Sequence, residues 1–396
     1  MKLTNNKIYL ALIFASLGHF LVDFMIGILP VYKTMQGLDI AKVGLIAGLC
    51  AFIGEGVQIY FGPLGDKGYR KLLLMLGLAG SVGACCFSYT TDYTLIFLMY
   101  LMTCIGSGAF HPSAVGIISN LTATKKSLFI GIFAAAGAFG IATSQLIFAN
   151  TFVWLGGHTL VLGIPAFILI FFVWRKLQEA PSKAPVSTEN RLTLFRNFFK
   201  RKDLRNLYFA TVCNQSLAWG LIFLLPDALK SMGYDSWIYL GGGHLFFVIG
   251  GAFAMAPAGY LADLYSPRVV MLTSIAVGAT ALYIFLFSPM LPVFALCSVL
   301  FVAGAAIGLN NPVAVSFGNR LMPEHPGVVN ACLMGLVWCI SEGIGQTGGG
   351  LLTTLFEDNA PVKALMILGF VCVPQFAAAF ALPDKAEETK PQIETA

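Results

Sequence analysis

The sequence predicts an all-α membrane protein in which twelve transmembrane helices form two pseudo-symmetric six-helix bundles. Hydrophobic residues make up 57% of the 396 residues and charged residues only 11%, whereas soluble domains usually carry about 25% charged residues. Twelve hydrophobic stretches are each long enough for the roughly 20 apolar residues that a spanning helix needs. Short motifs also recur between the two halves of the chain at an offset of about 200 residues, as expected for a duplicated unit.

The first predicted span, residues 8–32, follows Lys2 and Lys7 and in this respect is similar to a signal peptide. However, the apolar stretch is longer than that of a signal peptide, and His19 and Asp23 interrupt it. No small-residue cleavage site stands out. We therefore predict a retained spanning helix. The other predicted spans are 40–61, 71–91, 93–120, 127–150, 154–175, 205–229, 237–261, 268–288, 291–319, 327–355 and 362–382.

The positions of Lys and Arg predict the orientation of the chain. Of the 24 such residues, four fall in one set of loops, and the other 20 fall in the opposite set or in the terminal segments. Positive charge accumulates on the cytoplasmic side of membrane proteins. We therefore predict a multi-pass protein of the plasma (inner) membrane with both termini in the cytoplasm, taking the cell to be bacterial. The four exceptions are Lys33, Lys42, Lys230 and Lys363.

The long polar segment at 177–203 divides the chain into two predicted bundles, residues 1–176 and 204–383, and residues 384–396 are predicted to be a disordered tail. Within the linker, apolar residues recur at helical spacing around Phe195 and Phe198. This pattern fits a short amphipathic helix on the inner membrane surface or a solvated linker. The repeat is clearest where Gly-Ala-Phe-His-Pro-Ser-Ala-Val at 108–115 matches Gly-Leu-Asn-Asn-Pro-Val-Ala-Val at 308–315.

Carboxylates lie within the predicted spans, whereas Lys and Arg are absent from their interiors. Asp23, Glu55 and Glu342 are the clearest examples. An acid at the bilayer centre costs about 2.5–3.5 kcal/mol on insertion scales, so three without cationic partners would cost roughly 8–10 kcal/mol. Such groups are tolerated when they face a water-filled cavity, carry protons or meet a solute from outside. The pattern therefore favours a transporter with a polar central cavity.

The loop after the second predicted span reads Gly62-Pro-Leu-Gly-Asp66-Lys-Gly-Tyr-Arg70-Lys. It resembles the cytoplasmic loop signature of the major facilitator superfamily, Gly-x-Leu-x-Asp-x-x-Gly-x-Arg. A degenerate second copy contains Asp263, with Arg268 beyond it. In that family the loop is a latch that an acid and an arginine form in one conformation only. The resemblance thus implies that Asp66, Arg70, Asp263 and Arg268 form a conformational latch; a purely topological role is the alternative.

His19 and Asp23 are four residues apart and share a helix face, so they form either a proton relay or a mutually satisfied structural pair. His111, next to Pro112 in the fourth span, either lines the cavity or satisfies a backbone carbonyl. His-x-x-x-Asp with Leu-Pro at the end of its span, together with Phe-His-Pro, resembles the fosmidomycin-resistance branch of the superfamily, which consists of efflux pumps. The fifth span departs from the efflux pattern, because Gly137-Ala-Phe-Gly lacks the usual Gly-Pro pair.

Further polar side chains recur at helical spacing in several spans, as expected for a lined cavity. As a set they are predicted to border the substrate, although interhelical hydrogen bonding is the alternative for any single amide. The predicted proton-coupling residues are Asp23, His19, Glu342 and Glu55. The predicted cavity residues are His111, Gln58, Gln215, Trp219, Asn310, Asn311, Trp338 and Gln346.

We therefore predict a monomeric secondary active transporter that exports a small organic molecule by alternating access in exchange for protons; a proton-linked importer of a metabolite is the alternative. Without a cationic side chain in the cavity, cationic, zwitterionic or neutral substrates are expected. No nucleic-acid partner, cofactor or metal is expected, since the nine Cys lie mostly in apolar runs and show no metal-ligand spacing. A membrane-embedded enzyme is disfavoured because no His-Glu-x-x-His motif occurs, and a non-transporting receptor remains as a further class.

Overall fold

The computed structural model describes residues 5–121, 126–178 and 191–384, and these residues form helices and short connections without a strand. The fold class predicted from the sequence is therefore confirmed. The first half of the chain contains α1 (Asn5–Ile26), α2 (Leu29–Gln36), α3 (Ile40–Gly56), α4 (Gln58–Leu64), the π-helical η1 (Gly65–Tyr69), α5 (Arg70–Ser81), the 3₁₀ helix η2 (Val82–Tyr89), α6 (Tyr93–Ser119), α7 (Lys126–Trp154), the 3₁₀ helix η3 (Thr159–Gly163) and α8 (Ile164–Lys176).

The second half begins with a short helix and then repeats the pattern of long apolar helices. It contains α9 (Arg191–Lys200), α10 (Lys202–Ser231), the π-helical η4 (Ile238–Gly242), α11 (Gly243–Leu264), α12 (Pro267–Phe287), α13 (Val293–Leu321), α14 (Pro326–Asn330), the π-helical η5 (Ala331–Leu336), α15 (Val337–Glu342), the π-helical η6 (Gly343–Gly348), α16 (Gly349–Thr353), α17 (Ala360–Gly369) and α18 (Cys372–Phe380).

Eleven helical segments of the described chain are long and apolar enough to cross a membrane, and one of them holds two crossings. That segment, Ile40–Tyr89, has 50 residues and would be about 75 Å long as one helix, well beyond the ~30 Å hydrocarbon core. It turns back at Gly68, whose φ of 99° lies in the left-handed region that glycine adopts freely. The twelve predicted crossings thus correspond to these segments.

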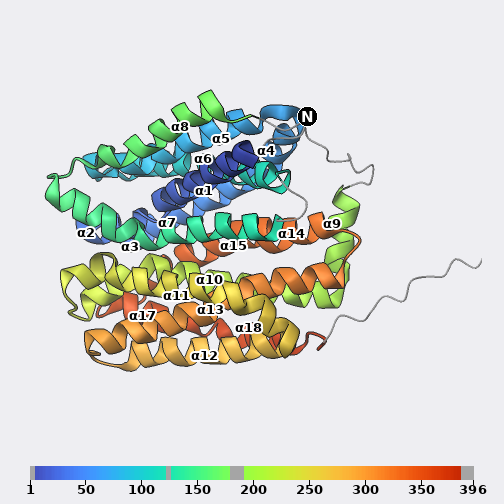
Figure 1. Ribbon diagram of the computed structural model, residues 1–396. Helices are drawn as coiled ribbons and strands as arrows, with labels where there is room; N and C mark the ends of the chain where they lie inside the picture. The colour runs from blue at the N-terminus through green and yellow to red at the C-terminus, as the bar shows by residue number, and fades with distance from the viewer. Residues whose placement is uncertain (1–4, 122–125, 179–190, 385–396) are drawn as a thin grey trace, which may run out of the picture.

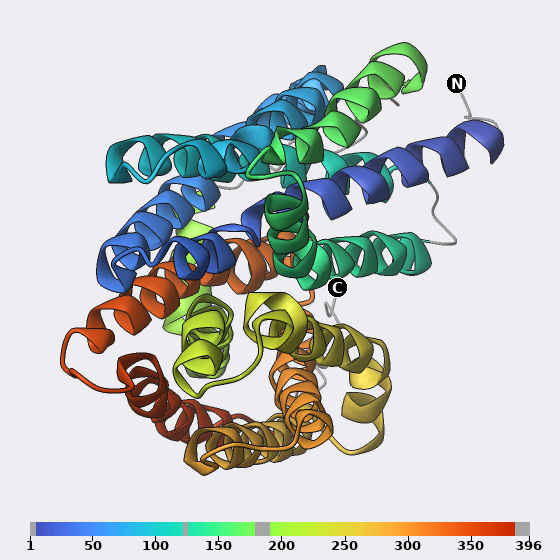
Figure 2. The same ribbon diagram turned by 90° about the vertical axis from the view of Figure 1, so that its left-hand side faces the viewer.

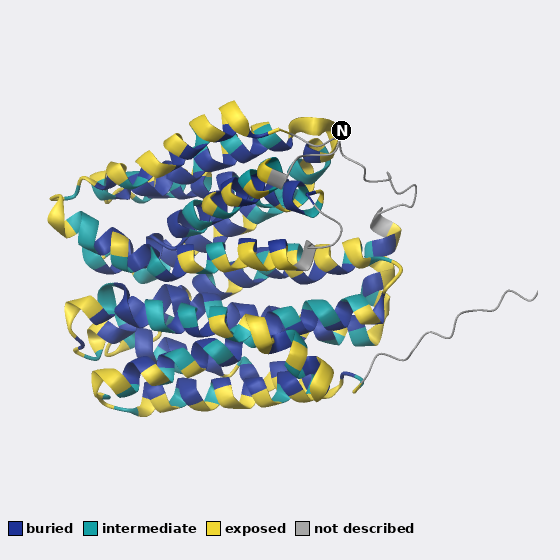
Figure 3. Ribbon diagram, viewed as in Figure 1, coloured by how far each residue is buried: buried dark blue, intermediate teal, exposed yellow. Residues whose placement is uncertain are grey.

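The crossing helices lie side by side in two groups (Figure 1), with the first half of the chain above the second. We call the end of the bundle that carries α2 the α2 end, and the opposite end, which carries α9, the α9 end. Figure 2 looks onto the α2 end and shows the two groups of helices meeting there. Exposed residues lie along the outer faces of the helices (Figure 3). They include large apolar residues such as Ile168 and Phe253, as expected for surfaces that contact lipid.

The two halves approach closely through small residues near the α2 end. A Cβ at Gly44 of α3 would lie 2.7 Å from the Gln346 carbonyl oxygen, and a Cβ at Gly48 would lie 2.0 Å from Thr347 Oγ1. Thr347 Oγ1 in turn donates a hydrogen bond to the Gly44 carbonyl at 3.0 Å. Only residues without side-chain bulk permit helices to pack this tightly. Most of the contact between the halves is made by α3 with the segment from α15 to α16 and by α7 with η4 and α11, while α2 contacts α10 and η4.

Lys33 lies in a different place from the one that the sequence analysis assigned to it. We placed it in a loop, but α2 continues to Gln36 and Lys33 is fully buried within that helix. The helix can restart there because Pro30 occupies one of its first positions, where the missing N–H costs nothing. The expectation that no cation lies inside a membrane-spanning segment was therefore wrong.

The predicted helix in the linker is present as α9 and packs against α10 and α14 at the α9 end. Phe198 is fully buried, and Phe199 meets Tyr208 of α10 edge to face, with ring centroids 5.0 Å apart. The apolar face of α9 is therefore covered by the second half of the chain, which differs from a solvated linker. The proposed division into bundles at 177–203 stays a prediction, because residues 179–190 lie outside the described part of the chain.

Two glycines of α11 offer a matched test of the close packing between α11 and α13. A Cβ at Gly250 would lie 2.1 Å from the Phe301 carbonyl oxygen, whereas a Cβ at Gly259 would meet nothing within 4 Å. We expect Gly250→Ala to lower the free energy of unfolding by about 1–3 kcal/mol, because the α11–α13 contact must open. Gly259→Ala should leave it unchanged or raise it by about 0.5–1 kcal/mol. Thermal unfolding of the purified variants measures both, and equal midpoints would contradict the close contact.

Candidate functional site

Three titratable side chains from α1 and α6 converge in the interior of the first half. His19 Nε2 lies 3.2 Å from Asp23 Oδ2, and His111 Nε2 lies 3.3 Å from Asp23 Oδ1. The two imidazole rings are nearly perpendicular, at 86°, with centroids 4.9 Å apart. The exposed fractions of the side chains are 11% for His19, 14% for Asp23 and 25% for His111. We call these three residues the His–Asp–His cluster, and it is partly accessible.

Backbone carbonyls fix the orientation of both histidines. His19 Nδ1 lies 2.7 Å from the Phe133 carbonyl oxygen, and His111 Nδ1 lies 3.0 Å from the Ser107 carbonyl oxygen. Because a carbonyl oxygen can only accept, these two contacts are hydrogen bonds in the tautomer that carries its hydrogen on Nδ1. His111 Nδ1 also lies 3.1 Å from Ser107 Oγ. Each Nε2 therefore faces the Asp23 carboxylate, either with a bare lone pair or with a second hydrogen. Two bare lone pairs beside a carboxylate would repel it, so this arrangement is suited to a bound cation.

Helix α7 forms the wall behind the His–Asp–His cluster. The Phe133 ring stacks on the His19 ring, with centroids 3.9 Å apart and an angle of 18° between their planes. One turn further on, a Cβ at Gly137 would lie 2.4 Å from His19 Cε1 and 2.5 Å from Asp23 Oδ2. Sequence reasoning missed the role of Gly137, although it had identified the segment as departing from the efflux pattern.

Two further carboxylates extend the cluster toward the second half. Glu55 of α3 interacts with Ser107, His111 and Asp23, and it accepts a hydrogen bond from Gln58. Glu342 of α15 is only 5% exposed and interacts electrostatically with Glu55 and Asp23. The four predicted proton-coupling residues and two predicted cavity residues, His111 and Gln58, therefore lie together. This group joins α1, α3 and α6 to α15 of the opposite half.

The polar residues of the second half divide into two sets. Trp219 and Trp338 meet edge to face, with centroids 6.0 Å apart, and Trp338 Nε1 and Gln346 Nε2 have no hydrogen-bond partner within the described chain. Trp338 and Gln346 lie in the helical segment that also carries Glu342, and they stay predicted contacts for a solute. The π-helical η5 and η6 flank α15, and such irregularities are frequent at functional sites.

The remaining predicted amides differ in their hydrogen bonds in this conformation. Asn310 Nδ2 donates to Ser274 Oγ of α12 at 2.7 Å. Gln215 Oε1 accepts from Asn214, whose Oδ1 accepts from Gln375 of α18. Asn311 is buried with its Oδ1 unpaired. The geometry thus favours the interhelical alternative for Asn310, whereas the interhelical bonds beside Gln215 are made by its neighbour Asn214.

The four predicted latch residues make ion pairs at the α9 end, but not all with the expected partners. Arg70 Nη2 lies 2.7 Å from Asp66 Oδ1, in the arrangement that the loop motif implies. Asp263 pairs with Arg320 of α13 at 2.8 Å, and Arg268 pairs with Asp384 at 3.4 Å. Asp263 therefore pairs with an arginine of another helix, and the second copy of the motif does not repeat the pairing of the first.

An ion pair that the sequence analysis missed joins the two halves at the α2 end. Lys33 of α2 donates to the Asp227 carboxylate of α10, and Thr34 Oγ1 donates to the same carboxylate at 2.8 Å. Lys33 Nζ also lies 4.5 Å from the centroid of the Phe223 ring. The sequence held one signal for this pair, because Lys33 and Asp227 each closely follow a Leu-Pro dipeptide, Leu29-Pro30 in the first half and Leu225-Pro226 in the second.

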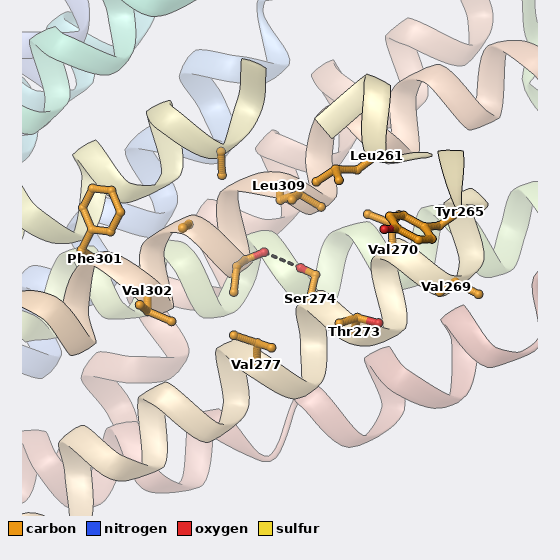
Figure 4. Close-up of a pocket in the computed structure, with 13 residues that line it drawn as sticks. Leu261, Tyr265, Val269, Val270, Thr273, Ser274, Val277, Phe301, Val302 and Leu309 are labelled. Atoms are coloured by element: carbon orange, nitrogen blue, oxygen red, sulfur yellow. Dashed lines mark hydrogen bonds between the residues drawn. The ribbon is translucent and has the colours of Figure 1, made fainter. Parts of the chain in front are cut away.

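A groove lies elsewhere, among α11, α12 and α13 (Figure 4). It has a volume of about 520 Å³ and a mostly apolar lining that includes Leu261, Val277 and Phe301. Its polar members are few, and Ser274 Oγ donates to the Ala306 carbonyl at 2.5 Å. No carboxylate or histidine lines this groove, so it is separate from the titratable cluster.

The sequence matches the family description "Major Facilitator Superfamily" over residues 8–345 and again over 236–396. The chain belongs to the major facilitator superfamily. It is therefore a membrane transporter by family, and the wider of the two resemblances found in the sequence is confirmed.

Individual relatives are distant. The chain is 22% identical over 364 residues to "Uncharacterized MFS-type transporter YfkF" of Bacillus subtilis, with 88% of this chain and 89% of the relative covered. It is 24% identical over 229 residues to "Inner membrane transport protein YajR" of Escherichia coli, covering 54% of this chain and 48% of the relative.

Solved structures share the fold at low identity. A bacterial homologue of the human lysosomal transporter Spinster, described as inward-facing and unoccupied, superposes with a TM-score of 0.80 at 16% identity, covering 95% of this chain and 97% of the other. A point mutant of the nucleoside transporter NupG superposes with a TM-score of 0.78 at 16% identity, covering 94% and 98%.

Proposed function

We propose that this member of the superfamily is a proton-coupled exporter of small organic molecules that works by alternating access. The observation that carries the proposal is the group of three carboxylates and two histidines that lies inside the membrane-spanning bundle and extends from one half to the other. Buried ionisable residues in membranes border solute or ion pathways. The narrower similarity to fosmidomycin-resistance efflux pumps is part of the same proposal.

The α2 end is closed in this conformation. Lys33, Thr34 and Asp227 join the halves there, and the glycine contacts of α3 lie nearby. If the α9 end is cytoplasmic, as the distribution of Lys and Arg indicates, the structure corresponds to a state closed toward the outside. The Asp66–Arg70 pair at the α9 end would then act in the change to the opposite state.

Glu55 and Glu342 are suited to link protonation with that change. Glu55 belongs to the first half and Glu342 to the second, and the two interact electrostatically. Two ionised carboxylates repel strongly where water is scarce, so a proton on either one allows the halves to approach. Loss of that proton would favour separation. Asp23 and His19 border this pair and belong to the same proposed group.

The charge of the site indicates the class of substrate. Within the described group the ionisable residues are acids and histidines, whereas the buried Lys33 is already paired with Asp227. A polyanion would find no free cationic partner, so we propose a cationic, zwitterionic or neutral organic substrate. Trp219 and Trp338 would provide aromatic surface for such a molecule.

Glu342→Gln tests proton coupling. We expect cells that express the chain to accumulate less of the cationic dye ethidium than control cells, and an uncoupler should abolish this difference. Because Gln cannot exchange a proton, Glu342→Gln should lose most of the effect, by about tenfold in initial rate, an energetic change of about 1.4 kcal/mol. Whole-cell fluorescence measures the dye.

Glu357→Gln, at an exposed position near the α2 end, is the matched control and should retain the activity. Extrusion that continues unchanged in Glu342→Gln would remove this residue from coupling. A higher dye content in expressing cells would instead favour the importing alternative.

A further inference from the structure

We propose that the His–Asp–His cluster is a binding site for a divalent transition-metal ion of the Zn²⁺ or Co²⁺ class. Neither the sequence motifs nor the family match predicts such a site. The proposal rests on four observations: the spacing of the three side chains, the orientation of the two imidazoles, the local charge and the access to the site. It is independent of whether the chain exports its substrate or is coupled to protons.

The spacing of the ligand atoms is close to that required. Zn²⁺ binds imidazole nitrogen at about 2.0–2.1 Å and carboxylate oxygen at about 2.0–2.2 Å, so two ligand atoms in a tetrahedral site lie roughly 3.4 Å apart. The distances here are 3.2 Å between His19 Nε2 and Asp23 Oδ2 and 3.3 Å between His111 Nε2 and Asp23 Oδ1. One ligand atom from each residue lies within 4.8 Å of the other two. The two short distances run to different oxygens of Asp23, so side-chain rotations that bring both Nε2 atoms and one oxygen around a common centre would complete the site.

The hydrogen bonds on the far side of each imidazole prepare the Nε2 atoms as ligands. His19 Nδ1 donates to the Phe133 carbonyl and His111 Nδ1 donates to the Ser107 carbonyl. Metal-bound histidines commonly donate their other N–H in this way, which fixes the tautomer and the orientation of the ring. In the neutral form of both imidazoles, the two Nε2 lone pairs then point toward the carboxylate that would share the ion.

The charge around the cluster favours a divalent cation. With neutral imidazoles the cluster carries the single negative charge of Asp23, and the Glu55 carboxylate lies within electrostatic range of both Asp23 and His111. Two nitrogens and one oxygen suit Zn²⁺, Co²⁺ or Ni²⁺, whereas Mg²⁺ and Ca²⁺ prefer oxygen ligands alone. Three protein ligands also leave a coordination position open for water.

None of the three side chains is completely buried, as expected of residues that an ion can reach. His111 is the most accessible, with a quarter of its side-chain surface exposed. A bound ion would tie α1 to α6 directly, and it would also fix His19 against α7 through the stacked Phe133. Occupancy should therefore stabilise the first half of the chain.

Metal binding can be measured on the purified full chain without a polyhistidine tag, after removal of ions with a chelator. We expect titration with Co²⁺ to give a visible d–d absorption band at one ion per chain, which an excess of Zn²⁺ but not of Mg²⁺ removes. Zn²⁺ should also raise the midpoint of thermal unfolding, because the ion binds the native state. These measurements use the unmodified protein and do not depend on any variant folding.

His111→Gln and Asp23→Asn should each weaken Zn²⁺ binding by at least about tenfold in calorimetry, since each removes one of three ligands. His158→Gln is the matched control, because His158 lies in the connection after α7 near Tyr89, outside the cluster, and it should leave the affinity unchanged. Circular dichroism of each variant confirms that the helices are retained.

Three results would overturn the proposal. The first is the absence of a stoichiometric Co²⁺ band in the unmodified chain. The second is an intense near-ultraviolet charge-transfer band, which would show that thiolates of the nine cysteines hold the ion instead. The third is an unchanged affinity in a folded His111→Gln chain. Dye export that persists in any of these cases would leave the proposed transport function intact.

Discussion

Gly137→Ala is expected to reduce transport by at least about tenfold. The added Cβ would lie 2.4 Å from His19 Cε1 and 2.5 Å from both His19 Nε2 and Asp23 Oδ2, distances that real Cβ contacts do not reach. Either α7 moves outward or the His19–Asp23 pair is displaced, at a cost of about 1–3 kcal/mol. A change of about 1.4 kcal/mol in a barrier is a factor of ten in rate. The uncoupler-sensitive extrusion of ethidium measures the loss.

Gly131→Ala is the control for this substitution. Gly131 lies in the same helix, less than two turns earlier, and a Cβ there would meet nothing within 4 Å. Both substitutions replace glycine by a better helix former, so any general effect on α7 is shared. Gly131→Ala should keep normal transport. If the two variants transport equally well, the proposed role of Gly137 in holding the pair fails.

The membrane-spanning segments could be predicted because the signal is distributed over many residues. Each span needs about 20 apolar residues, so one polar residue within it does not change the prediction of a spanning helix. The turn between the second and third crossings could also be predicted, since the loop motif places Gly68 where the backbone adopts a φ of 99°. The His19–Asp23 pair followed from helical spacing alone.

Contacts between distant helices could not be predicted in the same way. His111 and Asp23 lie on separate spans of the sequence, and nothing in either local pattern specifies that α1 and α6 cross at that height. The role of Gly137 could not be predicted for a related reason. A glycine at such a position matters because neighbouring groups occupy the space that a side chain would fill, and the sequence does not show which groups these are. The ion pairing of Asp263 with Arg320 likewise depends on packing between helices.

Lys33 shows where a correct local rule led to a wrong position. Leu29-Pro30 reads as the end of a helix, and a lysine beyond it reads as a loop residue. The chain instead begins α2 at Leu29, and the buried ammonium is compensated by a carboxylate from the other half. The compensating charge lies 194 residues away, so hydropathy within one window could not reveal it.

Asp227→Ala is expected to have the largest effect on the conformation of the chain. The substitution leaves the Lys33 ammonium fully buried without its carboxylate, and breaking a buried ion pair by removing one partner costs about 3–5 kcal/mol. That cost falls only on states in which the α2 end is closed. States in which Lys33 reaches water should therefore gain population, while the closed form should unfold at a lower temperature.

Nitroxide labels at Thr91→Cys and Glu357→Cys, exposed positions of the two halves at the α2 end, can report this shift by pulsed electron paramagnetic resonance. We expect a longer distance between the labels in Asp227→Ala than in the parent chain. Eight of the nine native cysteines are buried, which favours labelling at the two introduced positions. Asp235→Ala removes an exposed carboxylate from the same end and should leave the distance distribution unchanged.

The double substitution Lys33→Met/Asp227→Leu separates the loss of a link from the burial of an unpaired charge. Replacing both members of a buried ion pair by apolar residues of similar volume is often neutral or stabilising by about 1–4 kcal/mol. The double variant should therefore recover the unfolding temperature and the short label distance that Asp227→Ala loses. If it behaves like Asp227→Ala instead, the carboxylate holds the α2 end closed through another interaction, for which its hydrogen bond from Thr34 is the candidate.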